Sequence, residues 1–419
     1  MSAGSSGDFI SEYITYASDS TEPPAIFHRW AAIAGIGATL GREYYLNHGH
    51  FVLFPNMYCM LIGAPASRKS TAIKIMKEIM KLSGYNSIAA EKTTKEKFLM
   101  DLAGVGEEAA TPEDFLEQSL FGEEGKVAEM FVMNDEFNDF FGNNILDFIS
   151  LLGNLWDFSG SYESKLKNSK SLVINNPTIS ILSGNTPTTF SSTFPPEIFG
   201  QGFFSRILLI YSEPSGKKIA FPKIPAQETK NKIAKDLRDL KRFVSGEAKF
   251  SHSAELLAEK IYLEDNTLAD VRFATYFGRR FSHLLKLSLI VSAARRSSKI
   301  EEFDILYANT MLTYAEERMP KALGEFGKSK NADVAHKVMV LINSAHQVLT
   351  YNDIWKHISS DLEKYTDLAT IMRNLVEADK IQISPRKDGF LSKKKFTETR
   401  DSSIVDYSLL TEEEQRKTE

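Results

Sequence analysis

The sequence has one cysteine, Cys59, no long apolar run and no excess of basic residues. A single cysteine excludes an intramolecular disulfide and any metal site built from several thiolates, so we expect a reducing, cytoplasmic compartment. No stretch approaches the roughly 20 apolar residues that span a membrane, and the start of the chain lacks the basic-then-apolar pattern of a signal peptide. We therefore expect neither a membrane protein nor a disulfide-stapled secreted one.

A surplus of positive charge is also missing. The 50 basic and 55 acidic residues give a net charge of −5. This balance excludes a globally basic surface that grips nucleic acid, although a local basic stripe or a ring interior remains open. With 42% hydrophobic residues the composition is that of a globular protein, and 419 residues suffice for about two to four domains.

Four short apolar runs, separated by helical patterns, predict an α/β fold with a mainly parallel sheet covered on both faces. The runs begin at Tyr58, Met130, Thr178 and Phe204. In chain order the patterns predict a helical segment over 1–50, the sheet core over 51–213, a helical lid domain over 214–328, a winged-helix domain over 329–398 and a mobile acidic tail over 399–419.

The strongest functional signal is a turn of small residues between the first apolar run and an amphipathic helix. Such a turn presents backbone N–H groups and the positive end of the helix dipole to phosphates. In this pattern Lys69 reaches the β- and γ-phosphates and the Ser70 hydroxyl binds Mg²⁺, so we expect ATP and Mg²⁺ as cofactors of a P-loop core. The predicted nucleotide-binding residues are Gly63, Ala64, Pro65, Ala66, Ser67, Arg68, Lys69, Ser70 and Thr71.

One residue departs from the phosphate-loop consensus, because Arg68 stands where the consensus has a glycine before the lysine. A side chain fits there unless the position demands a positive φ, which leaves the loop geometry open. The alternative interpretation is an ordinary turn, rich in Ser and Ala, between a strand and a helix.

Two adjacent acids, Asp135 and Glu136, follow the second apolar run. Mg²⁺ needs a carboxylate near the phosphates, and hydrolysis needs a group that positions or deprotonates the attacking water. Asp135 is the candidate ligand of Mg²⁺, and Glu136 is the candidate group that positions or deprotonates the attacking water. The alternative is that the two acids only cap a helix after the strand.

Two further candidates flank later strands. Asn185, at the end of the third run, can orient the water or sense the γ-phosphate, or it can merely form a turn with the following Thr-Pro. Arg206, just before the fourth run, can stabilise transition-state charge in a neighbouring subunit, or it can make a surface salt bridge. Weaker arginine candidates are Arg279, Arg280, Arg295 and Arg296.

Taken together, these motifs resemble the phage and mobile-element family of P-loop ATPases that are often fused to, or encoded beside, primases. The resemblance covers roughly residues 8–320 and rests on PPAIFHRWAAIAGIGATLGR, FPNMYCMLIGAPASRKSTA, NDEF, SGNTP, GFFSRIL and FGRRFSHLLKLSLIVSAA. The adjacent acids and the later Asn are similar to AAA+ and viral-helicase ring ATPases rather than to RecA-type helicases. The resemblance implies a replicative, ring-forming DNA helicase, with a hexamer favoured, and it implies that the glycine before the lysine is often replaced.

Basic residues in two places are candidate contacts for single-stranded or forked DNA, because lysine and arginine neutralise phosphates. A solvated hairpin or a protein-docking module is the alternative in each place. The acidic tail is a candidate contact for a primase or polymerase, and solvating disorder is its alternative. The DNA candidates are Lys165, Lys167 and Lys170 in the core, and Arg386, Lys387, Lys393, Lys394 and Lys395 in the winged helix.

Three functional hypotheses remain from the sequence. The first is an ATP-driven DNA helicase or translocase of phage or mobile-element replication. The second is an ATP-switched helicase loader or replication initiator that binds DNA without sustained unwinding. The third, a DNA-binding regulator with a degenerate nucleotide fold, is disfavoured by the intact Lys69, Ser70, Asp135 and Glu136.

Overall fold

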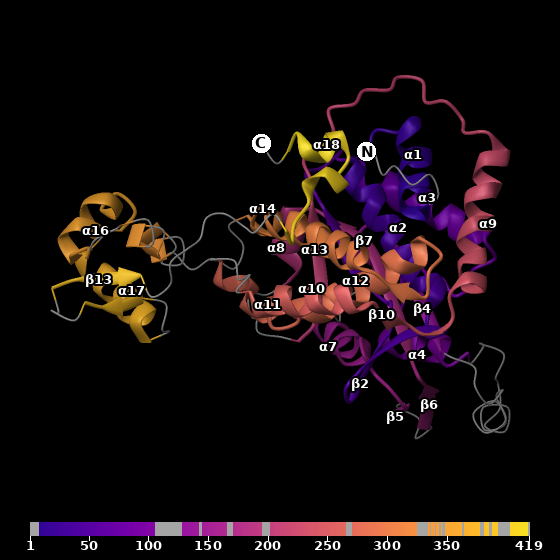
Figure 1. Ribbon diagram of the computed structural model, residues 1–419, viewed down its shortest axis with the longest axis horizontal. Coiled ribbons are helices and arrows are strands. Elements are labelled where there is room, and N and C mark those ends of the chain that lie inside the picture. Colours follow the sequence, from indigo (N-terminus) through magenta and orange to yellow (C-terminus); the bar gives the residue numbers. More distant parts are fainter. Residues whose placement is uncertain are drawn as a thin grey trace. The chain divides into compact units, whose positions relative to one another are not determined.

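The computed structural model divides the chain into two compact units (Figure 1). One unit comprises Met1–Asn266, Thr275–Gly324 and Ser403–Glu419, and the other comprises Thr267–Ala274 and Glu325–Ser402. The residues that the structure describes are 8–104, 128–141, 145–165, 171–194, 202–264, 270–324, 334–335, 337–339, 341–342, 345, 348–362, 364–377, 381–384, 388–392 and 403–417.

Two helices lead into the first unit, as the apolar spacing predicts. Asp8 caps α1 (Phe9–Asp19) by accepting hydrogen bonds from the backbone N–H groups of Ile10 and Ser11, at 3.1 and 3.2 Å. The cap satisfies donors that a helix start leaves unpaired. Pro24 then precedes α2 (Ala25–Leu40), which is buried at every position and runs through the centre of the unit.

A four-stranded parallel sheet forms the centre of the first unit, which confirms the prediction of a mixed α/β fold with a parallel sheet. The strands are β4 (Glu129–Asn134), β7 (Thr178–Asn185), β3 (Tyr58–Ile62) and β8 (Ile207–Tyr211), in that spatial order. All three pairings are parallel, so the carboxyl ends of the strands meet at one edge. The strands are almost completely buried, as expected for a sheet with helices on both faces.

The connections between these strands carry the remaining elements of the core. The β1–β2 pair and the β5–β6 pair are antiparallel, and α3 follows β3 directly. The elements are β1 (Tyr44–His48), β2 (Phe51–Leu53), α3 (Lys69–Leu82), α4 (Lys95–Leu102), α6 (Phe137–Phe141), α7 (Ile145–Leu155), β5 (Ser161–Lys165), β6 (Ser171–Asn175), α8 (Pro187–Thr193) and η2 (Phe204–Arg206).

The helical region after the sheet belongs to the same unit. Residues 212–226 have no regular secondary structure, and β9 then pairs in parallel with β1. The segments predicted over 1–50 and 51–213, and most of the lid predicted over 214–328, thus form one compact body. The elements are α9 (Gln227–Phe243), β9 (Gly246–Glu247), β10 (Lys249–Phe250), α10 (His252–Leu263), η3 (Val271–Phe273), α11 (Ala274–Phe277), α12 (Arg280–Ala294), β11 (Lys299–Ile300), α13 (Glu302–Glu316) and α14 (Met319–Leu323).

The most apolar helix, α12, carries one buried charge. Lys286 is fully buried, and its ammonium lies 2.7 Å from a carboxylate oxygen of Asp157 and donates to the side-chain oxygen of Asn56 at 2.7 Å. The two partners offset the cost of placing a charge in the core.

Among the described helices none is long and apolar enough to cross a lipid bilayer.

The second unit has its own apolar core. Helical residues between 334 and 342 are followed by α16 (Tyr351–Ile358), α17 (Tyr365–Glu377) and an antiparallel pair, β12 (Ile381–Ile383) and β13 (Phe390–Ser392). Their buried side chains include Ile354, Leu368 and Met372. Helices followed by a strand pair is the element order that the sequence predicts here.

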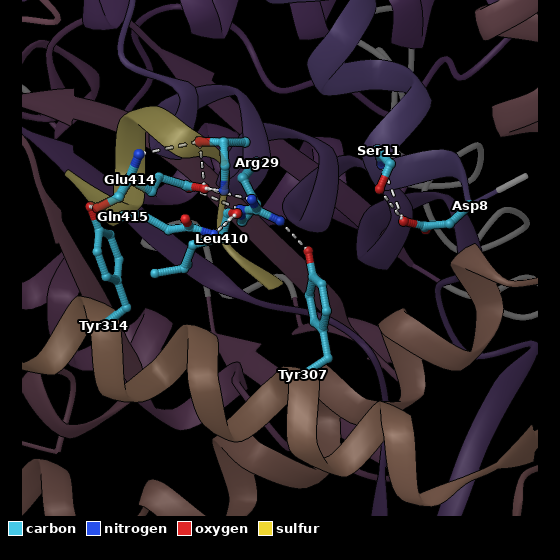
Figure 2. Close-up of polar contacts among 9 residues, drawn as sticks. Asp8, Ser11, Arg29, Tyr307, Tyr314, Leu410, Glu414 and Gln415 are labelled. Carbon is cyan, nitrogen blue, oxygen red and sulfur yellow. Dashed lines mark hydrogen bonds and ion pairs between the residues drawn. The ribbon is translucent and has the colours of Figure 1, made fainter. Parts of the chain in front are cut away.

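The C-terminal segment differs from the predicted mobile acidic tail, because residues 403–417 pack into the first unit. They form η4 (Tyr407–Leu409) and α18 (Glu412–Gln415). Figure 2 shows the carboxylate of Glu414 meeting the guanidinium of Arg29 on α2, with N–O distances of 2.9 and 2.6 Å, while Arg29 also donates to the Tyr307 hydroxyl. Both charged side chains are about 2–3% exposed. The acidic composition of the segment predicted a mobile tail, because composition alone does not show that Glu414 pairs with the buried Arg29.

Glu414→Ala should lower the free energy of unfolding by about 3 kcal/mol, because it leaves the charge of Arg29 buried without its partner. Urea unfolding followed by tryptophan fluorescence measures the change. Glu412→Ala is the matched control on the same helix, since Glu412 is 88% exposed and its ion pair with Arg416 lies at the surface; it should leave stability unchanged. Equal effects of the two variants would contradict the anchoring role of Glu414.

Candidate functional site

Three strands deliver the predicted site residues to one edge of the sheet. Ile62 at the end of β3 pairs with Asn185 at the end of β7, and Asn134 at the end of β4 pairs with Ser183. The Ser183 hydroxyl also donates to the backbone oxygen of Asn134 at 2.9 Å. Ligands of open parallel sheets bind outside the carboxyl ends of the strands. The loop after β3, the acids after β4 and Asn185 therefore meet where a ligand is expected.

The loop over 63–68 turns sharply from β3 into α3. A Cβ atom at Gly63 would lie 2.7 Å from the backbone oxygen of Ser212 and 2.7 Å from the Ser67 hydroxyl, so only glycine fits. The loop ends where α3 begins, at Lys69. The first N–H groups of a helix have no partner within the helix, and they carry the positive end of its dipole. This end of α3 is therefore suited to an anion.

Arg68 adopts the left-handed conformation that favours glycine, with φ 63° and ψ 24°. Position 68 therefore has the positive φ that the sequence left open, and the loop holds a side chain there. The Arg68 guanidinium pairs with Glu22 at 2.7 Å, and the other carboxylate oxygen of Glu22 accepts the backbone N–H of Ile219 at 2.9 Å. The backbone donor and then Arg68 lower the pKa of Glu22.

Lys69 is buried inside this loop. Its ammonium donates to the backbone oxygens of Gly63 and Ala64, at 2.9 and 3.2 Å, and to the Ser67 hydroxyl at 3.2 Å. Burial lowers the pKa of Lys69, and the negative charge of Glu136 opposes that effect. The loop thus holds a cation among backbone groups, next to the partly exposed Ser70 on the first turn of α3.

The acids after β4 have different surroundings. Asp135 forms an ion pair with Lys74 at 2.8 Å and remains 37% exposed. Burial raises the pKa of Glu136, the nearby Asp139 and Asp135 raise it further, and Lys69 opposes them. A raised pKa makes a carboxylate a better proton acceptor near neutral pH. Asp135 is thus an ion-paired carboxylate that is 37% exposed, whereas Glu136 is partly buried and has a raised pKa.

Asn185 lies between the loop and the acids, since β7 lies between β3 and β4. Its side-chain oxygen accepts the Thr186 N–H at 2.9 Å, and its amide nitrogen donates to the side chain of Asn138 at 3.3 Å. Thr186 then caps α8. The turn-forming role is therefore present, while the position between the two motifs also suits a sensor.

Arg206 lies at the opposite edge of the sheet. It precedes β8, whose first residue Ile207 pairs with Tyr58, the first residue of β3. The five residues of β3 separate that edge from loop 63–68 by about 15 Å. The guanidinium donates to the backbone oxygen of Gly202, and burial followed by the charge of Arg279 lowers its pKa. Arg206 does not join the other residues within one chain.

Three of the four weaker arginine candidates have structural partners, and the fourth, Arg279, is the N-cap residue of α12. Arg280 forms a buried ion pair with Glu316, with 2.7 Å between guanidinium nitrogen and carboxylate oxygen. Arg295 forms a bidentate ion pair with Asp304, with both nitrogen–oxygen distances at 2.7 Å. Arg296 lies 3.7 Å from Asp236. Among the predicted DNA contacts, Lys165 ends β5. The other predicted contacts, Lys167, Lys170, Arg386, Lys387, Lys393, Lys394 and Lys395, lie outside the described residues.

Two cavities adjoin the loop and the acids, and each is lined partly by residues that the sequence did not predict. A cavity of about 400 Å³ lies beside loop 63–68 and is lined by Glu22, residues 66–68 and residues 214–218. A second, of about 520 Å³, lies over the acids and includes Lys74, Lys77, Lys92 and Asp139. Only the folded chain brings Glu22 and residues 214–218 to the loop, so no local motif marks them.

The donor set fits a nucleotide with its metal better than a metal alone. Among the described residues no group of three or more His, Cys, Asp or Glu side chains can hold a metal ion. Asp135 and the Ser70 hydroxyl are hard oxygen ligands, so phosphate oxygens and water would have to complete the shell of Mg²⁺.

In the comparisons with known proteins, no family model and no curated protein matches this chain.

Arg68→Gly should be more stable to urea than Arg68→Ala, by about 1 kcal/mol, because a side chain in the left-handed region costs energy that glycine avoids. Both variants lose the ion pair with Glu22, so their difference isolates the backbone conformation. An alanine variant as stable as the glycine variant would mean that residue 68 does not hold a positive φ.

Proposed function

We propose that this chain is an ATP-dependent DNA helicase or translocase that works as a head-to-tail ring, with the hexamer as the favoured form. The observation that carries the proposal is the meeting of Lys69, the Asp135–Glu136 pair and Asn185 at the carboxyl edge of one parallel sheet. The resemblance to primase-associated phage ATPases supports the same class of function, and with it the host cytoplasm as the place of action.

Nucleotide binding is assigned to loop 63–68 and the start of α3. The loop's N–H groups and the ammonium of Lys69 neutralise the triphosphate. Ser70 and Asp135 hold Mg²⁺, which balances phosphate charge during transfer. The 400 Å³ cavity beside residues 66–68 has room for the base and ribose. Lys74, now paired with Asp135 at 2.8 Å, would have to release that carboxylate for the metal.

Hydrolysis is assigned to Glu136 and Asn185. The carboxylate of Glu136 accepts a proton from a water molecule as the water oxygen bonds to the γ-phosphorus, and the bond from the γ-phosphorus to the β–γ bridging oxygen breaks. Asn185, on the strand between the loop and the acids, orients the water by a hydrogen bond. The raised pKa of Glu136 supports the base role, because a more basic carboxylate takes the proton more readily.

Arg206 supplies transition-state charge to the neighbouring copy. Its place at the amino edge of β8 puts it about one strand length from its own loop, so it can serve only a site on another chain. A contact that joins the amino edge of one copy to the carboxyl edge of the next is head-to-tail, and such contacts form a ring when the rotation between copies closes and a filament when it does not. This arrangement is the support for a ring rather than a two-fold dimer.

DNA contact is assigned to few places, in keeping with the net charge of −5. The second unit, whose helices precede a strand pair, is proposed to be a winged helix that contacts DNA. Lys165, at the end of β5, is on a hairpin proposed to face the ring interior. Positive charge confined to such loops is enough to track a phosphate backbone.

Glu136→Gln should retain ATP binding and lose turnover, because the amide cannot accept the proton from water. Nucleotide binding by calorimetry and phosphate release by a coupled assay measure the two properties. In the unchanged protein, hydrolysis should fall as the pH falls through the raised pKa of Glu136, since protonation removes the base.

Asp139→Asn sharpens this test, because the negative charge of Asp139 helps to raise the pKa of Glu136. The acid limb of the pH–rate profile should therefore move to lower pH. Asp101→Asn, on α4 and paired with Lys97, is the matched control and should not move it. Unchanged hydrolysis by Glu136→Gln would remove Glu136 from its role and with it the proposed mechanism.

A further inference from the structure

We propose that Phe221 and Ile224 dock on an aromatic patch of a second copy of this chain and so join neighbouring copies head to tail. The inference rests on the proposed function for its choice of partner, because only a neighbouring copy can bring Arg206 to the loop. The exposed surfaces that carry it are independent of that function.

The first surface is an arm, residues 219–226, that leaves the carboxyl edge of the sheet. The chain exits β8 at Ser212, whose N–H donates to the backbone oxygen of Ile62 at 3.0 Å, and it reaches α9 only at Gln227. Figure 1 shows this connection as an arch that joins α9. Phe221 and Ile224 are 92% and 94% exposed. Two such side chains on one short irregular segment are typical of an interaction site rather than of a free surface.

The second surface is a patch formed by Phe51, Tyr262, Leu263 and Phe281. Phe51, Tyr262 and Leu263 are 70%, 64% and 75% exposed. The ring of Phe281 links them, with its centroid 4.7 Å from that of Tyr262 and 5.9 Å from that of His48, which pairs with Phe51 across the β1–β2 hairpin. The patch thus draws its residues from α10, α12 and β2, with Leu263 next to Tyr262 on α10.

The arm and the patch lie at opposite edges of the first unit. The arm begins beside the nucleotide cavity, which residues 214–218 line. Phe281 is two residues from His283, whose Nε2 lies 3.0 Å from the backbone oxygen of Ser205, next to Arg206. The patch therefore shares the amino edge with Arg206, and the arm shares the carboxyl edge with Lys69.

This division favours a second copy as the occupant. A head-to-tail contact that brings Arg206 to the neighbouring loop also brings the patch to the edge from which the neighbouring arm leaves. Phe221 and Ile224 remain 92% and 94% exposed, so in the part of the chain that the structure describes no side chain buries them. One interface then completes the nucleotide site and buries both apolar surfaces.

Cysteine cross-linking tests the contact directly, because Cys59 is buried and is the only cysteine. Phe221→Cys and Leu263→Cys proteins, purified separately and mixed under mild oxidation, should give disulfide-linked dimers in the mixture at least fivefold above either protein alone. Leu82→Cys, at an apolar residue 44% exposed on α3, replaces Leu263→Cys as the matched control. No excess over that control would overturn the proposal. A Phe221→Cys/Leu263→Cys double variant extends the test: a disulfide that forms only within one chain of this protein would also overturn the proposal.

Phe221→Ser/Ile224→Ser gives a second measurement that does not require a cross-link. Light scattering should show the mass of a single chain at concentrations where the unchanged protein and Leu82→Ser assemble. Mg²⁺–ATP binding should be unchanged, because neither arm residue lines the cavity. An unchanged assembly mass would overturn the inference, whereas failure of the unchanged protein to bind Mg²⁺–ATP would count against the proposed function and leave the arm contact standing.

Discussion

The parallel pairing of β3 with β7, and of β7 with β4, is the constraint on which the account depends. It aligns Ile62 with Asn185 and Asn134 with Ser183, so that three separate stretches of sequence end at one edge. The packing follows from it, since strands buried on both faces need helices on each side. The candidate site follows too, because Lys69, the Asp135–Glu136 pair and Asn185 lie where those strand ends meet.

The same parallel arrangement places Arg206 at the opposite edge from Lys69, so the proposed catalytic site would need residues from two copies. The aromatic patch lies with Arg206 and the exposed arm lies with Lys69, so in the proposed ring the contact between copies and the catalytic site would share one surface. The C-terminal segment adds a separate restraint: Glu414 pairs with Arg29, and the ammonium of Lys417 lies 3.3 Å from the hydroxyl of Ser212, where the chain leaves β8.

Residues next to apolar runs were predictable from the sequence, and residues joined by distant contacts were not. The apolar runs separated by helical patterns correctly predicted a parallel sheet, and the polar residues after the runs follow its strands. The sequence was also enough to predict that Arg206 and Lys69 lie at opposite edges of the sheet. Arg206 precedes one parallel strand and Lys69 follows another, so the two residues cannot lie at the same edge. The contact of Glu414 with Arg29, 385 residues apart, leaves no local pattern, and neither does Glu22 at the loop. Those depend on tertiary packing alone.

The shared site is tested most directly by mixing two inactive variants, Arg206→Ala and Glu136→Gln. The first retains Lys69 and Glu136 and lacks the arginine, while the second retains the arginine and lacks the base. The account predicts that each protein alone has no ATP hydrolysis and that the mixture regains part of it, because Arg206 of one chain completes the site of another. A mixture as inactive as its components, in assemblies shown to contain both chains, would contradict a site shared between copies.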